Sequence, residues 1–169
     1  MSDFLLAFEA MIVNEGGYKL HTVAGDKGGM TYAGISRRAH PEWTGWQDLD
    51  AGSKPAAERV RAFYRSNYWD RMRLDDVESQ RIARTIFDFG VNAGPGTAAK
   101  LAQLVVGVTP DGAIGPKTIA ALNMADPDRF SLAYALAKIA RYRDIVTRDR
   151  SQSKFLLGWI NRTLEEATA

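Results

Sequence analysis

Cysteine is absent from the 169 residues of this chain, which excludes disulfide bonds and thiolate metal ligands. Histidine is scarce as well, and His21 and His40 alone are too few for most zinc sites. The sequence also lacks an Asp-rich loop of the usual calcium-binding form. We therefore expect neither a bound metal nor a cofactor.

The chain also lacks a strong excess of charge and any long apolar run. Its 22 basic and 20 acidic residues leave a formal net charge of +2, which is too balanced to indicate nucleic-acid binding. No stretch approaches the roughly 20 apolar residues that a membrane-spanning helix needs. Residues 1–9 have no basic region and are interrupted by Asp3 and Glu9, unlike a signal peptide. We expect the chain to be made and folded in the cytoplasm.

Helical periodicity covers most of the sequence. Residues 2–15 predict an amphipathic helix with Ser2 as N-cap and Gly16-Gly17 as its end. Its apolar face is expected to hold Phe4, Leu5, Phe8, Met11 and Ile12. Over 18–35 the periodicity is lost and glycines accumulate, which favours short strands in a small hairpin.

The rest of the chain is expected to be helical, after a stretch at 36–54 of irregular structure with one short helix. Further helices are predicted at 54–71, 75–92, 97–106, from 116, from 127 to about 150, and at 153–167. The last should bury Phe155, Leu156, Trp159, Ile160 and Leu164. The fold class is therefore mainly α (α+β), with a small N-terminal β-hairpin element.

Glu15 is the first candidate for acid chemistry. It ends the first predicted helix, where the partial negative charge of a helix C-terminus disfavours a carboxylate. Met11 and Ile12 would also keep water from it. Both effects raise the pKa of a carboxyl group, as a general acid requires. Without further context, a solvated glutamate at a fraying helix end explains the position better.

Asp26 and Thr31 follow in the glycine-rich hairpin segment. Cleavage of a glycosidic bond needs an acid for the leaving oxygen and a group that serves the other face of the sugar. A carboxylate and a hydroxyl opposite Glu15 would hold the attacking water. Turn formation by Gly25-Asp26-Lys27-Gly28 explains Asp26 equally well.

Asp88 and Asn92 lie one helical turn apart and share a face. That face would line a polar sugar-binding groove, whereas an Arg84–Asp88 surface ion pair is an equally good reading. Among the aromatic residues, Tyr18 and Tyr32 are candidates for stacking on sugar rings. Trp43, Trp46 and Trp69 are others, although most aromatic side chains in a chain of this size pack in the core. His21 is a candidate for hydrogen bonding to substrate, or incidental.

Six blocks of sequence together resemble a known family. They are Glu15-Gly16-Gly17-Tyr18, Asp26-x-Gly28-Gly29-x-Thr31-x-x-Gly34-Ile35, Tyr64-x-x-x-Tyr68-Trp69, Asp88-x-Gly90-Val91-Asn92-x-Gly94, Val108-Thr109-Pro110-Asp111-Gly112-x-Ile114-Gly115-Pro116-x-Thr118 and Phe155-x-x-Gly158-Trp159-x-x-Arg162. The first four resemble glycoside hydrolase family 108. The last two resemble the predicted peptidoglycan-binding region that follows in that family.

The resemblance implies a lysozyme-like helical fold and N-acetylmuramidase activity on bacterial peptidoglycan, in the manner of a phage endolysin. Glu15 matches the family's catalytic glutamate. Asp26 and Thr31 become assisting catalytic residues by analogy with the Glu–Asp–Thr arrangement of phage lysozymes. Tyr18, His21, Tyr32, Asp88 and Asn92 are taken as substrate-binding residues.

The resemblance also sets the expected organisation. Residues 1–92 would form the catalytic muramidase region and 93–169 a peptidoglycan-binding-like region, together in one compact structural unit. We expect a monomer, with a holin as partner for its release to the cell wall. Two alternatives stay open: a lytic transglycosylase that cleaves the same bond, and a non-catalytic wall-binding module.

Overall fold

The computed structural model describes residues 1–14, 16–22 and 29–168. It divides into two compact units, each described here by itself. The N-terminal unit is Asp3–Arg71, and the C-terminal unit is Met72–Ala169 together with Met1–Ser2. The predicted mainly α class with a small N-terminal β element is confirmed. No helix in the described ranges is both long enough and apolar enough to span a membrane.

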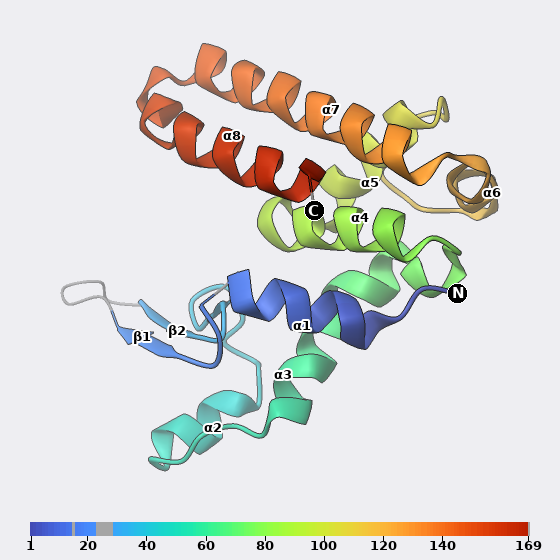
Figure 1. Ribbon diagram of the computed structural model, residues 1–169. Helices are drawn as coiled ribbons and strands as arrows, with labels where there is room; N and C mark the ends of the chain where they lie inside the picture. The colour runs from blue at the N-terminus through green and yellow to red at the C-terminus, as the bar shows by residue number, and fades with distance from the viewer. Residues whose placement is uncertain (15, 23–28, 169) are drawn as a thin grey trace. The chain divides into compact units, whose positions relative to one another are not determined.

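The N-terminal unit contains the sheet and three α-helices (Figure 1). Its elements are α1 Phe4–Asn14, β1 Leu20–Thr22, β2 Met30–Tyr32, β3 Ile35–Ser36, α2 Gly45–Asp50, α3 Ala57–Tyr64, the π-helical turn η1 Arg65–Trp69, and η2 Asp70–Met72, whose last residue belongs to the C-terminal unit.

Helix α1 departs from the prediction at its start and on one face. Asp3 caps it, because its Oδ1 accepts hydrogen bonds from the backbone N–H of Leu5 at 2.7 Å and of Leu6 at 3.4 Å. The expected N-cap, Ser2, instead donates its backbone N–H to the carbonyl of Val77. The predicted burial of Leu5 is wrong, since this side chain is 52% exposed.

The sheet is antiparallel in the order β1-β2-β3, so the predicted hairpin carries one further strand. Ala33 and Gly34 connect β2 to β3 with positive φ angles of 49° and 78°. Two consecutive positive φ angles define the tight type I′ turn that matches strand twist. The hydroxyl of Tyr64, on α3, donates to the carbonyl of Ala33 at 2.8 Å and anchors this turn.

An aromatic core holds the N-terminal unit together. The Phe4 ring lies 5.6 Å from Trp69, and Phe8 lies 5.7 Å from Tyr64. A second group stacks beside the sheet and contains Tyr32, Trp43, Trp46 and Phe63. All three tryptophans of this unit are buried, in agreement with the packing interpretation of these residues.

The helix expected at 54–71 changes its winding after Tyr64. The side chain of Ser66 donates to the carbonyl of Ala62 at 2.9 Å, and that of Asn67 donates to the carbonyl of Phe63 at 2.9 Å. Side chains that compete for backbone carbonyls loosen the regular α-helical pattern. The chain continues as the π-helical turn η1, whose last residue, Trp69, is fully buried.

The C-terminal unit is helical throughout its described elements. These are η3 Leu74–Asp76, α4 Gln80–Ala93, α5 Pro95–Val105, α6 Pro116–Met124, α7 Pro127–Arg148, η4 Arg150–Gln152 and α8 Ser153–Thr168. Proline begins α5, α6 and α7, where its missing N–H costs no helical hydrogen bond. Helix α4 begins later than predicted, because Ser79 rather than Asp75 caps it through a bond from the N–H of Ile82.

In this unit α4 packs against α5 and α7, α5 also packs against α7, and α7 and α8 lie side by side (Figure 1). Phe89 of α4 meets the ring of Tyr134 on α7 edge-on at 5.8 Å. The hydroxyl of Tyr134 donates to the carbonyl of Ala98 on α5 at 3.0 Å. On α8 Thr163 is buried, whereas Phe155 and Leu164, which belong to the predicted apolar face, are half exposed.

The Asp111-Gly112 motif forms a turn that Gln103 holds in place. The buried amide of Gln103 donates to Asp111 Oδ1 at 2.7 Å and to the carbonyl of Ala113 at 3.0 Å. Its Oε1 accepts the backbone N–H of Gly112 at 2.9 Å. Gly112 has a φ of 88°, which favours glycine. The motif therefore has a structural role.

Candidate active site

The chain on either side of position 15 is fixed by the end of α1. Gly17 donates its N–H to the carbonyl of Ile12 at 2.8 Å, and Gly16 donates to Val13 at 3.1 Å. These two bonds form a Schellman end, with Gly16 at a φ of 85°. The predicted helix end at Gly16-Gly17 is confirmed. Glu15 itself lies outside the described residues.

The strand register brings two of the predicted site residues together. Thr31 of β2 lies opposite His21 of β1 and opposite Ser36 of β3. Because directly opposed residues share a face of a sheet, these three side chains point to the same side. Asp26 follows β1 in the sequence and also lies outside the described residues.

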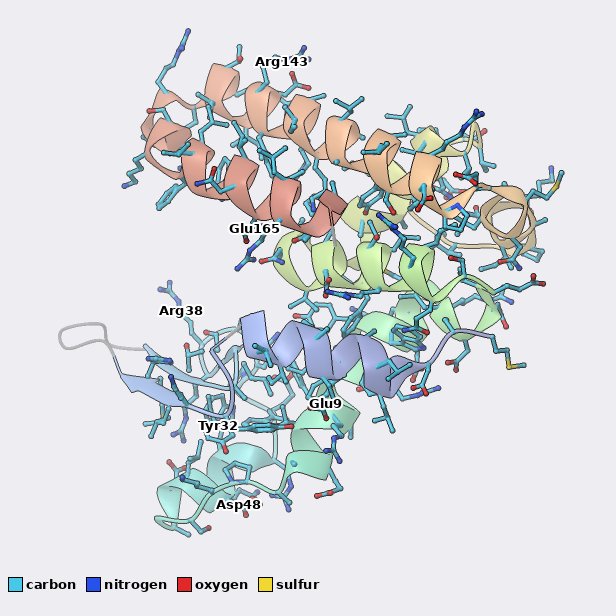
Figure 2. The ribbon with its side chains drawn as sticks, viewed as in Figure 1. Glu9, Tyr32, Arg38, Asp48, Arg143 and Glu165 are labelled. Carbon is cyan, nitrogen blue, oxygen red and sulfur yellow. The ribbon has the colours of Figure 1, made fainter. Side chains whose placement is uncertain are left out.

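Tyr18 presents its ring rather than its hydroxyl. The hydroxyl is buried beside the guanidinium of Arg61 on α3. Arg61 in turn pairs with Glu9 at 3.3 Å, and Figure 2 shows Glu9 projecting from α1. Burial raises the pKa of Tyr18, the Glu9 carboxylate adds to this rise, and Arg61 opposes it. The phenol therefore stays protonated at neutral pH, and its ring is the part available to a ligand.

A pocket of about 490 Å³ lies beside β1 and gathers three of the predicted substrate-binding residues, Tyr18, His21 and Tyr32. Its volume falls within the roughly 300–1,000 Å³ of small-ligand sites. Tyr32 is mainly a core residue, since it is only 2% exposed and its ring stacks on that of Trp43, with 6.2 Å between the ring centres. Figure 2 shows it within the packed side chains of this unit.

The sequence did not point to the remaining walls of this pocket. They comprise Lys19, Leu20, Leu49, Gly52, Ser53 and Lys54. Residues 49–54 come from the end of α2 and the segment after it, which carries no motif. Only the tertiary structure brings them to the β1 edge.

Asp88 and Asn92 belong to the C-terminal unit, on α4. Asp88 is 6% exposed, so its contact with Arg84 at 3.7 Å is not a surface ion pair. Burial raises the pKa of Asp88 to about 7, with a further rise from Glu166, against the opposing charges of Arg84, Lys138 and Arg162. Its Oδ1 has no hydrogen-bond partner in the described part of the chain.

Asn92 is exposed and links two helices. Its Nδ2 donates to the backbone carbonyl of Asp88 at 2.8 Å, and its Oδ1 accepts from Arg162 on α8. Both residues therefore lie among charged side chains of the C-terminal unit. Their role toward a substrate stays a prediction.

Two family models match this chain one after the other. The model for glycosyl hydrolase 108 matches residues 8–94, and the model described as a predicted peptidoglycan domain matches residues 97–164. The matches meet between α4 and α5, whereas the compact units meet between Arg71 and Met72. Helix α4 thus matches the first model in sequence but packs with the helices of the second.

A solved structure is similar over nearly the whole chain. SagA from Brucella abortus superposes with a TM-score of 0.74 at 28% sequence identity, covering 98% of this chain and 91% of SagA. No curated protein sequence matches the chain.

Proposed function

The chain belongs to glycosyl hydrolase family 108, and on that premise we propose that it hydrolyses the β-1,4 bond between N-acetylmuramic acid and N-acetylglucosamine. The two matched models support a glycoside hydrolase that acts on peptidoglycan. The specific bond and the mechanism are our proposal. The match over 8–94 carries it, because this range includes the Glu15-Gly16-Gly17-Tyr18 block.

In the proposed mechanism Glu15 protonates the leaving glycosidic oxygen. The Schellman end of α1 supports this role, because the partial negative charge of a helix C-terminus favours a protonated carboxyl group nearby. The proton is then available at neutral pH, as general acid catalysis requires.

Asp26 and Thr31 assist on the other face of the sugar. The second carboxylate would support positive charge on the sugar and hold the attacking water, and the Thr31 hydroxyl would orient that water. Thr31 shares its sheet face with His21, which places hydroxyl and imidazole groups on one surface. The ring of Tyr18 in the pocket beside β1 offers an apolar surface to a sugar.

Digestion of purified peptidoglycan tests the proposal. Hydrolysis gives muropeptides with free reducing ends, heavier by one water than the 1,6-anhydro ends that a lytic transglycosylase makes. Mass spectrometry that shows mainly anhydro ends would establish the transglycosylase alternative. Peptidoglycan that stays intact would instead support the alternative of a non-catalytic wall-binding module.

The role of Glu15 is tested by Glu15→Gln, which keeps the shape of the side chain and removes its proton. We expect it to fold normally and to lose activity by about 10²–10⁴-fold, the usual contribution of general acid catalysis. Glu42→Gln, at a 72% exposed glutamate of the same unit, is the matched control and should retain full activity. Lysis by Glu15→Gln above about a tenth of the wild-type rate would contradict the assignment.

We further propose an endolysin role, in which a monomer made in the cytoplasm reaches the wall with the help of a holin. This part rests on the family alone. Expression with and without a holin in a bacterial host should give lysis only when both are present. Lysis by this chain alone would contradict the need for a holin. Size-exclusion chromatography would test separately whether the chain is a monomer.

A further inference from the structure

The C-terminal unit contains a second pocket, of about 460 Å³, that the proposed catalysis does not use. Helices α4, α7 and α8 line it, and its main side chains are Phe89, Asn92, Arg141, Tyr142, Trp159 and Arg162. Asn92 and Arg162 are 70 residues apart and are joined here by a hydrogen bond. The pocket thus unites two of the family-like sequence blocks, one on α4 and one on α8.

One wall of this pocket is aromatic. The ring of Tyr142 lies 5.1 Å from that of Trp159, with an interplanar angle of 33°. Phe155 extends the surface, stacking on Trp159 at 6.0 Å. Trp159 is only partly buried, so one side of the aromatic group can receive a ligand. Such a wall packs well against aliphatic chains and sugar rings.

The other wall is cationic, and part of its charge is uncompensated. Lys138 is buried, lies 5.2 Å from the centre of the Phe89 ring and pairs with Glu166, so these two charges balance. Arg141 has no ion-pair partner among the described residues, whereas Arg143 on the same helix pairs with Asp144 at 2.7 Å. The lining residues Lys138, Arg141 and Arg162 are basic and Glu166 is acidic, so the formal charge of the pocket lining is positive.

We propose that this pocket binds a free carboxylate of the peptide stem of peptidoglycan. The proposal rests on the peptidoglycan substrate of the proposed function. Guanidinium groups bind carboxylates through paired, charge-assisted hydrogen bonds. The backbone sugars of the polymer are neutral N-acetyl sugars once their lactyl groups carry peptides, so the carboxylates lie on the peptides. The aromatic wall would contact the aliphatic parts of the same peptide.

Binding of a synthetic stem tripeptide, L-alanyl-γ-D-glutamyl-L-lysine, to the full chain tests this proposal by isothermal titration calorimetry. The control ligand is the same peptide with both carboxylates converted to amides. The test variant is Arg141→Gln, and the matched control is Arg143→Gln, whose side chain points away from α8 (Figure 2). Both variants remove one positive charge from α7.

We expect the wild-type chain and Arg143→Gln to bind the acidic peptide equally well. Arg141→Gln and the amidated peptide should each lower the affinity by about tenfold or more, the usual loss for a hydrogen bond between charged groups. In a parallel NMR titration the amide signal of Gly158, which lines the pocket, should shift in the wild type. This signal reports the site directly and shows that Arg141→Gln is folded.

Equal binding of the acidic and amidated peptides would overturn the proposal, as would unchanged affinity in Arg141→Gln or the absence of binding to the wild type. A Gly158 signal that does not move while peptide binds would place the ligand elsewhere. Because the tripeptide contains no glycosidic bond, these results do not depend on hydrolysis. A failure to release reducing ends from peptidoglycan would overturn only the proposed function.

Discussion

Replacing Asp88 by asparagine should remove a pH-dependent loss of stability from this protein. Burial is the main reason that the pKa of Asp88 rises from 3.8 to about 7. The folded protein therefore keeps the Asp88 carboxyl group protonated at pH values where the same group is ionised in the unfolded chain. A group of this kind stabilises the fold least when it is ionised, so stability falls as pH rises from about 4 to about 7 and is constant above that range.

The size of the effect follows from the difference in pKa between the two states. A difference of about 3, at about 1.4 kcal/mol for each pKa unit, corresponds to about 4 kcal/mol. This is a large part of the roughly 5–15 kcal/mol by which domains are usually stable. Asparagine has nearly the same shape and no charge to bury, so Asp88→Asn should not show this loss.

Urea unfolding at pH 4 and at pH 8, followed by circular dichroism, measures the difference. From pH 4 to pH 8 the free energy of unfolding of the wild type should fall by about 3–4 kcal/mol more than that of Asp88→Asn. Asp144→Asn, at a surface carboxyl of α7, is the control and should follow the wild-type profile. Parallel profiles for the wild type and Asp88→Asn would refute the reasoning. They would mean that Asp88 ionises as easily in the folded protein as in the unfolded chain.

Three further outcomes are expected. Exhaustive treatment with a chelator should leave lytic activity unchanged, since the chain has no cysteine and no metal-type cluster occurs in the described ranges; a loss restored by one divalent ion would contradict this. Tyr64→Phe should lower the free energy of unfolding by about 1–2 kcal/mol by removing the bond to Ala33, and an unchanged urea midpoint would count against that anchor. Gly45→Ala should lower the free energy of unfolding by about 1–3 kcal/mol, because a Cβ there would lie 2.3 Å from the Trp43 ring. Gly96→Ala, with open space around the added Cβ, is the control and should not lower it.

Short-range sequence signals predicted several boundaries of helices correctly. Gly16-Gly17 ends α1, and α7 begins at Pro127 as predicted. Asp126 precedes it as the N-cap and accepts a bond from the N–H of Arg129 at 2.9 Å. These features depend on residues within one helical turn. The glycine-rich segment likewise predicted strands, although not the third strand.

The predictions that are wrong concern features that depend on residues far apart in the sequence. Phe4 and Leu5 are adjacent and equally apolar, but Phe4 is buried, with its ring against Trp69, which lies 65 residues later in the chain, while Leu5 is exposed. The helix predicted from residue 75 begins only after Ser79, which caps it, while Asp75 lies in the short helix η3.

The same distinction holds for the two pockets. Tyr18, His21 and Tyr32 of the pocket beside β1 lie within 15 residues of one another, so the sequence could point to them together. Arg141 stands in no motif, and its place in the second pocket appears only when α4, α7 and α8 are packed. Helical spacing predicts Asp88 as a groove residue, whereas only the tertiary structure buries it near the charges of Lys138 and Glu166.

Helix α4 gives a final prediction, because it matches one family model and packs with the helices of the other. Its Phe89 fills the space beside Tyr134 and Tyr142, and its Arg81 pairs with Asp128 on α7 at 2.7 Å. Loss of one such buried phenylalanine costs about 3–5 kcal/mol, comparable to the whole stability of a small domain.

A fragment that begins at residue 72 should therefore unfold cooperatively in urea, whereas one that begins at residue 97 should not. The second fragment keeps the matched peptidoglycan domain but exposes the faces of α5 and α7 that α4 covers. Circular dichroism and urea titration of both fragments measure the difference. Cooperative unfolding of the shorter fragment at the same urea midpoint would show that the sequence boundary, and not the packing boundary, defines the folding unit.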